Sequence, residues 1–137
     1  MIKLFASLAA ILTFCSLLLG ANKLERKGSF GVVINNNFVH FSYVLTYLGE
    51  SYKEGYIAFR LEFEDNKGFD LTSEIDESET VLKNLRNQKL KGKIERKTAR
   101  TAVILFPKKK DYKLTGKTRL TTSVMGYKLR KTFKLSS

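Results

Sequence analysis

Hydrophobic and polar residues alternate along most of the chain after residue 28, which is the pattern of β-strands that bury one of their two faces. The clearest run covers residues 57–63, where every second side chain is Ile, Phe or Leu and the others include Arg60 and Glu62. Seven or eight such segments, separated by short turns, favour a mainly β fold, an antiparallel β-sandwich of immunoglobulin-like character. The Trp and the paired Cys of true immunoglobulin domains are absent. A small β-barrel or a curved sheet packed on a helix is the alternative.

Turn residues divide these segments into three predicted hairpins. Asn35–Asn37 separates a strand at 28–34 from one at 38–48, because Asn tolerates the left-handed backbone conformation that tight turns require. The strand at 38–48 is expected to be largely buried on both faces. The other two hairpins are predicted to join 57–64 to 69–75 around the turn 65–68, and 117–124 to 127–135 around Met125 and Gly126.

Two further strands and one short helix complete the expected fold. The pattern predicts one strand at 90–97 and another at 101–106, the latter apolar enough to be covered on both faces. A helix is expected around 77–89, since Asp76 and Glu79 could form a capping box at its start. The apolar stripe of this helix would consist of Val81, Leu82 and Leu85.

The amino terminus has the composition of an export signal. Residues 4–21 form an apolar run that follows Lys3 and closes with the small residues Gly20 and Ala21. We therefore expect a signal peptide at 1–21 and a single β-rich domain at 22–137, exported to the bacterial periplasm, the cell surface or the medium. The absence of an Asn-x-Ser/Thr triplet agrees with a bacterial source.

Two alternatives to a cleaved signal stay open at the amino terminus. Residues 4–21 could remain as a membrane anchor, because about 18 apolar residues can just span a bilayer. A lipoprotein would use Cys15 as the lipidated residue, although the bulky Phe14 beside it argues against this. If the signal is cleaved, the only Cys leaves with it and the domain folds without a disulfide.

The charge of the chain is large and unevenly distributed. Lys and Arg total 25 against 13 Asp and Glu, which gives a formal net charge of +12. Residues 22–82 carry 6 basic and 11 acidic side chains, a net charge of −5, whereas residues 83–137 carry 18 and 2, a net charge of +16. An excess of one sign indicates an anionic partner or surface.

Basic residues of the second half supply the candidate anion-binding site. Alternate residues of a strand lie about 7 Å apart on one face, near the spacing of successive charges along polyanions. Lipopolysaccharide, anionic lipid, teichoic acid, an acidic polysaccharide or an acidic protein would all suit such a surface, whereas nucleic acid is disfavoured by export. A solvated basic face that keeps strands from aggregating is the competing explanation. The candidate residues are Lys91, Lys93, Lys97, Lys108, Lys109, Lys110, Lys117, Arg119, Lys128, Arg130 and Lys134.

An acidic face is expected on the predicted hairpin at 57–75. Its solvent side would bring together Glu62, Glu64, Asp70 and Glu74. The second hypothesis is therefore a structural or assembly protein, in which this acidic face docks on the basic hairpin at 117–135 of a neighbour or partner. Opposite patches on one molecule favour such head-to-tail contacts.

No enzyme, cofactor or metal site is expected. His40 with Ser42 on the same strand face lacks a third group to complete a nucleophilic site. Asp65, Asn66 and Asp70 resemble part of a calcium loop, but Lys67 stands at a ligand position. The carboxylates of the acidic face point to solvent rather than into a site that could raise the pKa of one of them.

Overall fold

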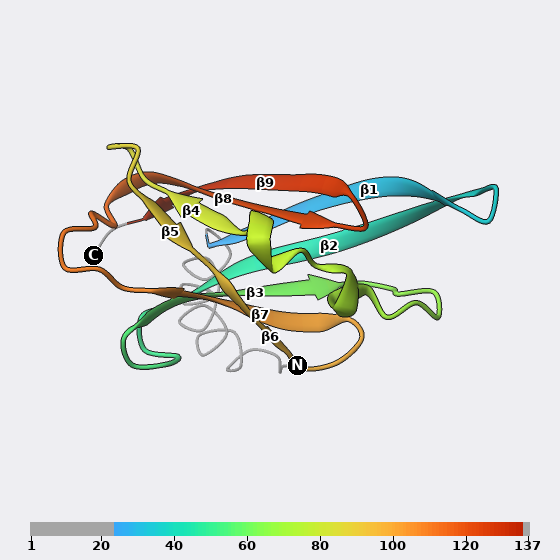
Figure 1. The fold of residues 1–137 in the computed structure, drawn as a ribbon, viewed down its shortest axis with the longest axis horizontal. Helices are drawn as coiled ribbons and strands as arrows, with labels where there is room; N and C mark the ends of the chain where they lie inside the picture. Colours follow the sequence, from blue (N-terminus) through green and yellow to red (C-terminus); the bar gives the residue numbers. More distant parts are fainter. Residues whose placement is uncertain (1–23, 136–137) are drawn as a thin grey trace, which may run out of the picture.

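The alternating segments form two antiparallel sheets that pack face to face as a β-sandwich (Figure 1). The computed structural model describes residues 24–135. The expected signal peptide at 1–21 lies outside these residues. A mainly β fold and a sandwich architecture are thus confirmed, with nine strands in the described part of the chain.

The larger sheet contains five strands in the order β1-β2-β3-β7-β6. The predicted hairpin around Asn35–Asn37 is present, and both Asn35 and Asn36 adopt positive φ, at 51° and 65°. The apolar strand predicted at 101–106 is buried from Ala102 to Phe106, as expected. The strands of this sheet are β1 (Glu25–Ile34), β2 (Asn37–Gly49), β3 (Tyr56–Phe63), β7 (Thr101–Pro107) and β6 (Lys93–Arg96).

The smaller sheet contains four strands in the order β5-β4-β8-β9. Its longest hairpin, β8–β9, turns at Met125 and Gly126 and pairs Lys117 with Lys134, as the alternation predicts. The strands of this sheet are β5 (Lys89–Lys91), β4 (Val81–Lys83), β8 (Gly116–Val124) and β9 (Tyr127–Leu135).

The core lies between the two sheets and is rich in aromatic rings. Phe59 of β3 contacts Phe106 of β7 in the same sheet and Phe133 of β9 in the other, with ring centroids 5.9 Å and 5.1 Å apart. Burial of such rings and of the Leu and Ile side chains around them is the main force that holds the sheets together. The largest fully buried side chains of the core are Phe41, Leu45, Ile57, Phe59, Leu61, Phe63, Leu71, Leu82, Leu90, Ile104, Phe106 and Phe133.

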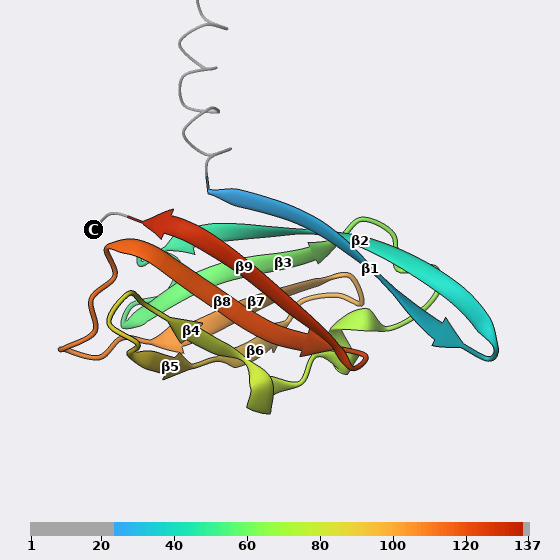
Figure 2. The same ribbon diagram turned by 90° about the horizontal axis from the view of Figure 1, so that it is seen from above.

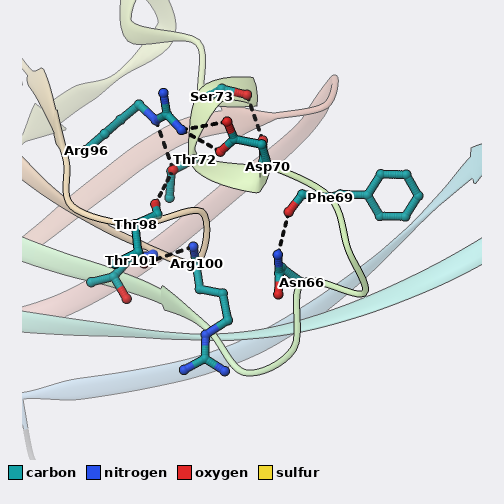
Figure 3. Close-up of polar contacts among 9 residues, drawn as sticks. All are labelled: Asn66, Phe69, Asp70, Thr72, Ser73, Arg96, Thr98, Arg100 and Thr101. Atoms are coloured by element: carbon teal, nitrogen blue, oxygen red, sulfur yellow. Dashed lines mark hydrogen bonds and ion pairs between the residues drawn. The ribbon is translucent and has the colours of Figure 1, made fainter.

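The predicted hairpin at 57–75 is wrong. β3 is paired on both sides, by β2 and by β7, so it has no edge left for residues 69–75. That segment instead forms a loop with a 3-10 turn, η1 (Leu71–Glu74), whose buried Thr72 donates a hydrogen bond to the carbonyl of Thr98. Figure 3 shows this loop tied to the connection between β6 and β7.

The predicted helix around 77–89 is also wrong. Asp76 caps only a short 3-10 turn, η2 (Glu77–Glu79), where its carboxylate accepts a hydrogen bond from the amide of Ser78. Residues 81–83 and 89–91 then pair with each other, and 81–83 also pair with β8. A helix this short depends on packing for its stability, and the ladder with β8 provides better pairing for the same residues.

The strand predicted at 90–97 is divided between the two sheets. Lys91 ends β5 and Lys93 begins β6, so the chain crosses from one sheet to the other at Gly92. A Cβ atom on Gly92 would lie 2.7 Å from Cγ2 of Thr80 and 2.8 Å from the ring of Phe106. Only glycine therefore allows the crossing without displacing its neighbours.

One face of strand β2 is exposed where the sequence predicts burial. Its inward side chains, such as Phe41 and Leu45, are buried, but Phe38, His40 and Ser42 on the opposite face are exposed. Among residues 24–135, no strand or loop covers this part of the sheet's outer face, where β1 and β2 extend together beyond the other strands at one end of the molecule (Figures 1 and 2). The expected burial on both faces is therefore not observed there.

Candidate functional site

The outward face of the four-stranded sheet carries most of the predicted basic residues. Figure 2 views this sheet from the side turned away from the other sheet. Apolar side chains such as Leu82 and Leu120 point inward, and most of the basic side chains point outward. We define the basic face as the outward side chains Lys83, Lys89, Lys91, Lys117, Arg119, Lys128, Arg130 and Lys134.

The centre of the basic face is a row of three cations on adjacent strands. Lys83 of β4 lies directly opposite Lys89 of β5 on one side and Arg119 of β8 on the other. Like charges in direct cross-strand pairs destabilise a sheet. A carboxylate or a neutral residue in this row would remove that repulsion, so the row is not explained by the stability of the sheet.

Acidic side chains are nearly absent from the basic face. Within residues 24–135, its one ion pair joins Nζ of Lys128 to Oε1 of Glu79 at 3.5 Å, and both side chains are about half exposed. Such a pair contributes little to stability. The remaining cations therefore present a positive potential that internal carboxylates do not cancel.

Two shallow hollows lie on either side of the Lys83–Arg119 pair, and both residues line both hollows. The first has a volume of about 280 Å³ and includes Lys117, Leu85 and Thr132 in its lining. The second has a volume of about 430 Å³ and is lined by Glu79, Val81, Lys83, Lys89, Arg119, Thr121, Lys128 and Arg130. Each hollow is large enough for a phosphate or sulfate group together with its neighbouring atoms.

The rim of the first hollow is a loop held by Asn84, a nearly buried residue. Oδ1 of Asn84 accepts hydrogen bonds from the amides of Arg86 and Gln88 at 3.0 and 2.9 Å. Its Nδ2 donates to Oε1 of Gln88 and to the carbonyl of Lys113 at 2.7 and 2.8 Å. The loop that carries Leu85 and Asn87 is thus fixed before any ligand binds, which lowers the entropic cost of binding.

Six of the predicted anion-binding residues belong to the basic face, and five do not. Lys93 and Lys97 lie on or after β6 in the other sheet, and Lys108–Lys110 follow β7. Lys97 pairs with Glu95 at 3.0 Å and Lys108 with Glu50 at 2.5 Å. The expected arrangement of Lys91, Lys93 and Lys97 on one side of a single strand is wrong, because Gly92 separates them into two sheets.

The interaction between Lys97 and Glu95 is local and exposed. A hydrogen bond from Lys97 and another from Tyr52, at 2.9 Å, lower the pKa of Glu95. The same contact with Glu95 raises the pKa of Lys97. These charges balance each other and leave Lys97 less available to an external anion than the cations of the basic face.

Lys83 and Lys89 are central to the basic face but are not among the predicted anion-binding residues, because both fall within the helix predicted at 77–89. The signal that could have identified them is a short strand pattern, in which a buried Leu lies between two outward residues. It occurs twice, at 81–83 and at 89–91. Each run is only 3 residues long, too short to outweigh the helical pattern around it.

The four predicted acidic residues are not arranged as the hairpin prediction requires. Glu62 lies on β3 opposite Val44 and Thr101, and Glu64 follows the end of that strand. Asp70 accepts two hydrogen bonds from the guanidinium of Arg96 (Figure 3). Glu74 ends the 3-10 turn η1. The hairpin on which the acidic face was predicted does not form.

His40, Asp65 and Asn66, the candidates for catalysis or calcium binding, lie in ordinary strand and turn environments. His40 is exposed on β2, and its ring lies 5.6 Å from that of Phe38. Asp65 accepts a hydrogen bond from the amide of Lys67, and Asn66 donates one to the carbonyl of Phe69 at 2.7 Å. Across residues 24–135, no three His, Cys, Asp or Glu side chains are grouped closely enough to hold a metal ion.

In the part of the chain that the structure describes, no helix has the length and apolarity needed to cross a bilayer. Comparison of the chain with protein-family models, with curated proteins and with solved structures finds no match.

Proposed function

We propose that this protein is an exported anion-binding module that attaches through its basic face to an anionic component of the cell envelope. The observation that carries the proposal is the row Lys89–Lys83–Arg119, in which three cations on adjacent strands face one another without a carboxylate between them. The surrounding cations extend this row in both directions along β8 and β9.

The chemistry of the face favours a ligand with several closely spaced phosphate, sulfate or carboxylate groups. Neighbouring strands lie about 5 Å apart and alternate residues of one strand about 7 Å apart, so the cations form a two-dimensional grid. A single small anion would contact only part of this grid. Lipopolysaccharide, a layer of anionic lipid and an acidic polysaccharide all present repeated charges at such spacings.

Arg119 is the cation best suited to hold an individual anionic group. Its planar guanidinium can donate two parallel hydrogen bonds to a phosphate or carboxylate. Lys83 beside it adds a compact charge, and the two side chains line both hollows. The other lysines would then contribute attraction that depends on distance and salt rather than on geometry.

Retention on immobilised heparin and on phosphatidylglycerol vesicles tests the proposal. The double variant Lys83→Gln/Arg119→Gln should bind at least about tenfold more weakly, and each lost contact should reduce the slope of log affinity against log salt by about 1. The matched control is Lys109→Gln/Lys110→Gln, which removes the same charge from an exposed loop outside the basic face. Its binding should stay within about twofold of the parent if the face, rather than net charge, determines affinity.

Three results would count against this function. Retention that does not change between low and physiological salt would exclude an electrostatic surface. Equal losses in the two double variants would mean that binding follows net charge alone. Binding to an acidic protein, but to neither heparin nor anionic vesicles, would replace the envelope component by a protein partner.

Export is a separate part of the proposal and has a separate test. It is supported by the apolar run at 4–21 in the sequence. Fractionation of the producing cells, followed by mass measurement of the amino terminus, distinguishes cleavage near residue 21 from an intact anchor and from a lipid on Cys15. Recovery of the intact chain in the cytoplasm would exclude export, and with it an envelope component as the ligand.

A further inference from the structure

The β1–β2 hairpin is the one long part of the described chain without charge. Residues 28–49 contain no Asp, Glu, Lys or Arg over 22 positions, whereas 28% of the whole chain is charged. These residues form most of β1 and β2 and the turn between them. The tip of the hairpin projects beyond the rest of the sandwich at one end of the molecule (Figures 1 and 2).

The tip of the hairpin is apolar on both of its faces. On the outer face, Val33 and Phe38 are paired directly across the two strands and are 71% and 68% exposed. The ring of Phe38 lies over Gly31, where a side chain would clash with it. On the inner face, Val32, Ile34 and Val39 are only partly buried against the core.

Strand β1 also has an unpaired edge along the tip. It is the end strand of its sheet and, among the described strands, pairs with β2 alone. Near its start, Nε of Arg26 donates a hydrogen bond to the carbonyl of Thr132 on β9 at 3.0 Å. Farther along, the ring of Phe30 stacks on that of Tyr127 at 4.9 Å, at the end of β9 where that strand meets its turn.

Beyond this point the edge of β1 has none of the usual protection. Edge strands are commonly shielded by charged side chains, by Pro or by a bulge, because their free amides and carbonyls can pair with another chain. Residues 30–34 contain no charge and no Pro, and their register with β2 is continuous. The segment is rich in β-branched residues, which favour strand pairing.

We propose that two copies of this chain associate through this edge, with β1 of each copy paired antiparallel to β1 of the other. Such a contact is isologous: the same segment on each copy supplies both halves of the interface. It would pair the free backbone groups of residues 30–34 and bring Val33 of each copy beside Gly31 of the other, where the ring of Phe38 lies. The two five-stranded sheets would then continue across the pair.

Charge explains why a second copy is the favoured occupant. Each chain carries a net charge of +12, so two copies repel each other wherever their basic faces approach. The uncharged hairpin is the surface through which they can approach with the least repulsion. Because it lies at one end of the sandwich, the basic faces of both copies remain open to an anionic ligand.

The turn at the tip argues against insertion of the hairpin into a lipid bilayer. Asn35, Asn36 and Asn37 occupy the outermost position and would enter the apolar layer first. Their side-chain amides and the backbone of the turn would lose hydrogen bonds to water, which is unfavourable for each group left without a partner. In the proposed pair, these residues extend past the contact and stay in water.

Cross-linking of the full chain inside the cells that produce it tests the pairing. The background is Cys15→Ser, which leaves the thiol introduced by Val33→Cys as the only one, and a short bismaleimide is applied before lysis. A product of twice the chain mass is expected. Ser51→Cys, in an exposed loop outside the hairpin, is the control for random collision and should give no such product.

Added charge then determines whether the hairpin itself forms the contact. Ser29→Lys and, separately, Phe38→Lys should each reduce the cross-linked product at least about tenfold, because each adds one lysine per copy to a contact that is otherwise uncharged. Both positions are exposed, so the fold should survive. Ser51→Lys adds the same charge elsewhere and should leave the product unchanged, as should Lys83→Gln/Arg119→Gln on the basic face.

Each other outcome would overturn the proposal. A dimer that is insensitive to Ser29→Lys and Phe38→Lys would form through another surface. A dimer that disappears at high salt would indicate an electrostatic head-to-tail contact. Cross-links only to proteins of other masses would assign the hairpin to another protein. Protection of the thiol in the Val33→Cys variant from a water-soluble maleimide by lipid vesicles, without a dimer, would assign the hairpin to a membrane.

Discussion

Lys83 of β4 and Arg119 of β8 lie directly opposite each other in the smaller sheet, and Lys89 lies on the other side of Lys83. Like charges in direct pairs weaken the sheet, and the same row concentrates positive charge on its outward face. Stability and binding should therefore respond in opposite directions when one of these charges is removed, and that opposition distinguishes a binding surface from a merely solvated one.

Neutralising Lys83 should stabilise the fold. Lys83→Gln removes two direct like-charge pairs, so the free energy of unfolding should rise by up to about 0.5 kcal/mol at low salt. Urea unfolding at low and high salt measures the effect, which should shrink as salt screens the repulsion. Lys110→Gln, in a loop, is the control and should change stability less. A loss of stability in Lys83→Gln would mean that repulsion in this row is negligible.

Replacing Gly92 should destabilise the crossing between the sheets. In Gly92→Ala the new Cβ would approach Cγ2 of Thr80 and the ring of Phe106 within 3 Å, at a cost of about 1–3 kcal/mol. Chemical denaturation measures this cost. The double variant Gly92→Ala/Thr80→Ser removes the first of the two contacts but keeps the buried hydroxyl pair with Thr122, so it should recover part of the loss. If no stability is recovered, the contact with Thr80 does not contribute to the loss.

The stability of the loop that contains η1 should depend more on the buried hydroxyl of Thr72 than on the ion pair of Asp70. Thr72 is almost fully buried, donates to the carbonyl of Thr98 at 2.6 Å and accepts from Nε of Arg96 at 3.1 Å (Figure 3). Thr72→Val leaves these partners unsatisfied and should cost about 1–3 kcal/mol.

Asp70 provides the comparison within the same loop. Its ion pair with Arg96 is about half exposed, so Asp70→Asn should cost less than about 1 kcal/mol. Urea unfolding of both variants under one set of conditions gives the ranking. A larger loss of stability in Asp70→Asn than in Thr72→Val would mean that the ion pair, rather than the buried hydroxyl, holds this loop.

Two tyrosines should make the fold sensitive to alkali. Burial raises the pKa of Tyr43 from 10.0 to about 12, with a smaller contribution from Tyr127, and burial raises the pKa of Tyr112 to about 12 as well. Both hold their proton more tightly in the folded than in the unfolded chain. Their contribution to stability is therefore complete below pH 10 and is lost as the pH rises toward 12.

The alkaline effect is isolated by comparison with a double variant. Tyr43→Phe/Tyr112→Phe removes both titrating groups, so its stability should fall less steeply between pH 9.5 and about pH 11 than that of the parent. Slopes rather than absolute stabilities are compared, because Tyr112→Phe also loses the hydrogen bond to the carbonyl of Leu82 at every pH. Equal slopes of stability against pH in the parent and the double variant would contradict the raised pKa values of Tyr43 and Tyr112.

The hairpins with short connections show how far local pattern determines this fold. The β8–β9 hairpin has the predicted turn at Met125 and Gly126 and the predicted pairing of Lys117 with Lys134. The turn residues and the alternation of apolar side chains determine such a register without help from distant parts of the chain. The outward position of Lys117, Arg119, Lys128, Arg130 and Lys134 follows from the same alternation.

The segment from residue 69 to residue 91 shows where local pattern is insufficient. Phe69, Leu71 and Ile75 alternate as a strand would, but both edges of β3 are occupied by β2 and β7. Val81, Leu82 and Leu85 have helical spacing, yet Leu82 is buried in a strand and Leu85 is 65% exposed. In both cases a partner distant in sequence provides more pairing than the local structure would.

The sequence by itself determined the mainly β sandwich, the hairpins at both ends of the domain and the outward direction of the cations on β8 and β9. These features depend on alternation and turn chemistry, which act between neighbours. Only the tertiary structure decided that Lys83 and Lys89 join those cations, that Lys93 and Lys97 are separated from them at Gly92, and that no acidic hairpin forms. The physical reason is competition for strand edges: each edge accepts one partner, and which segment occupies it depends on the whole set of strands in the fold.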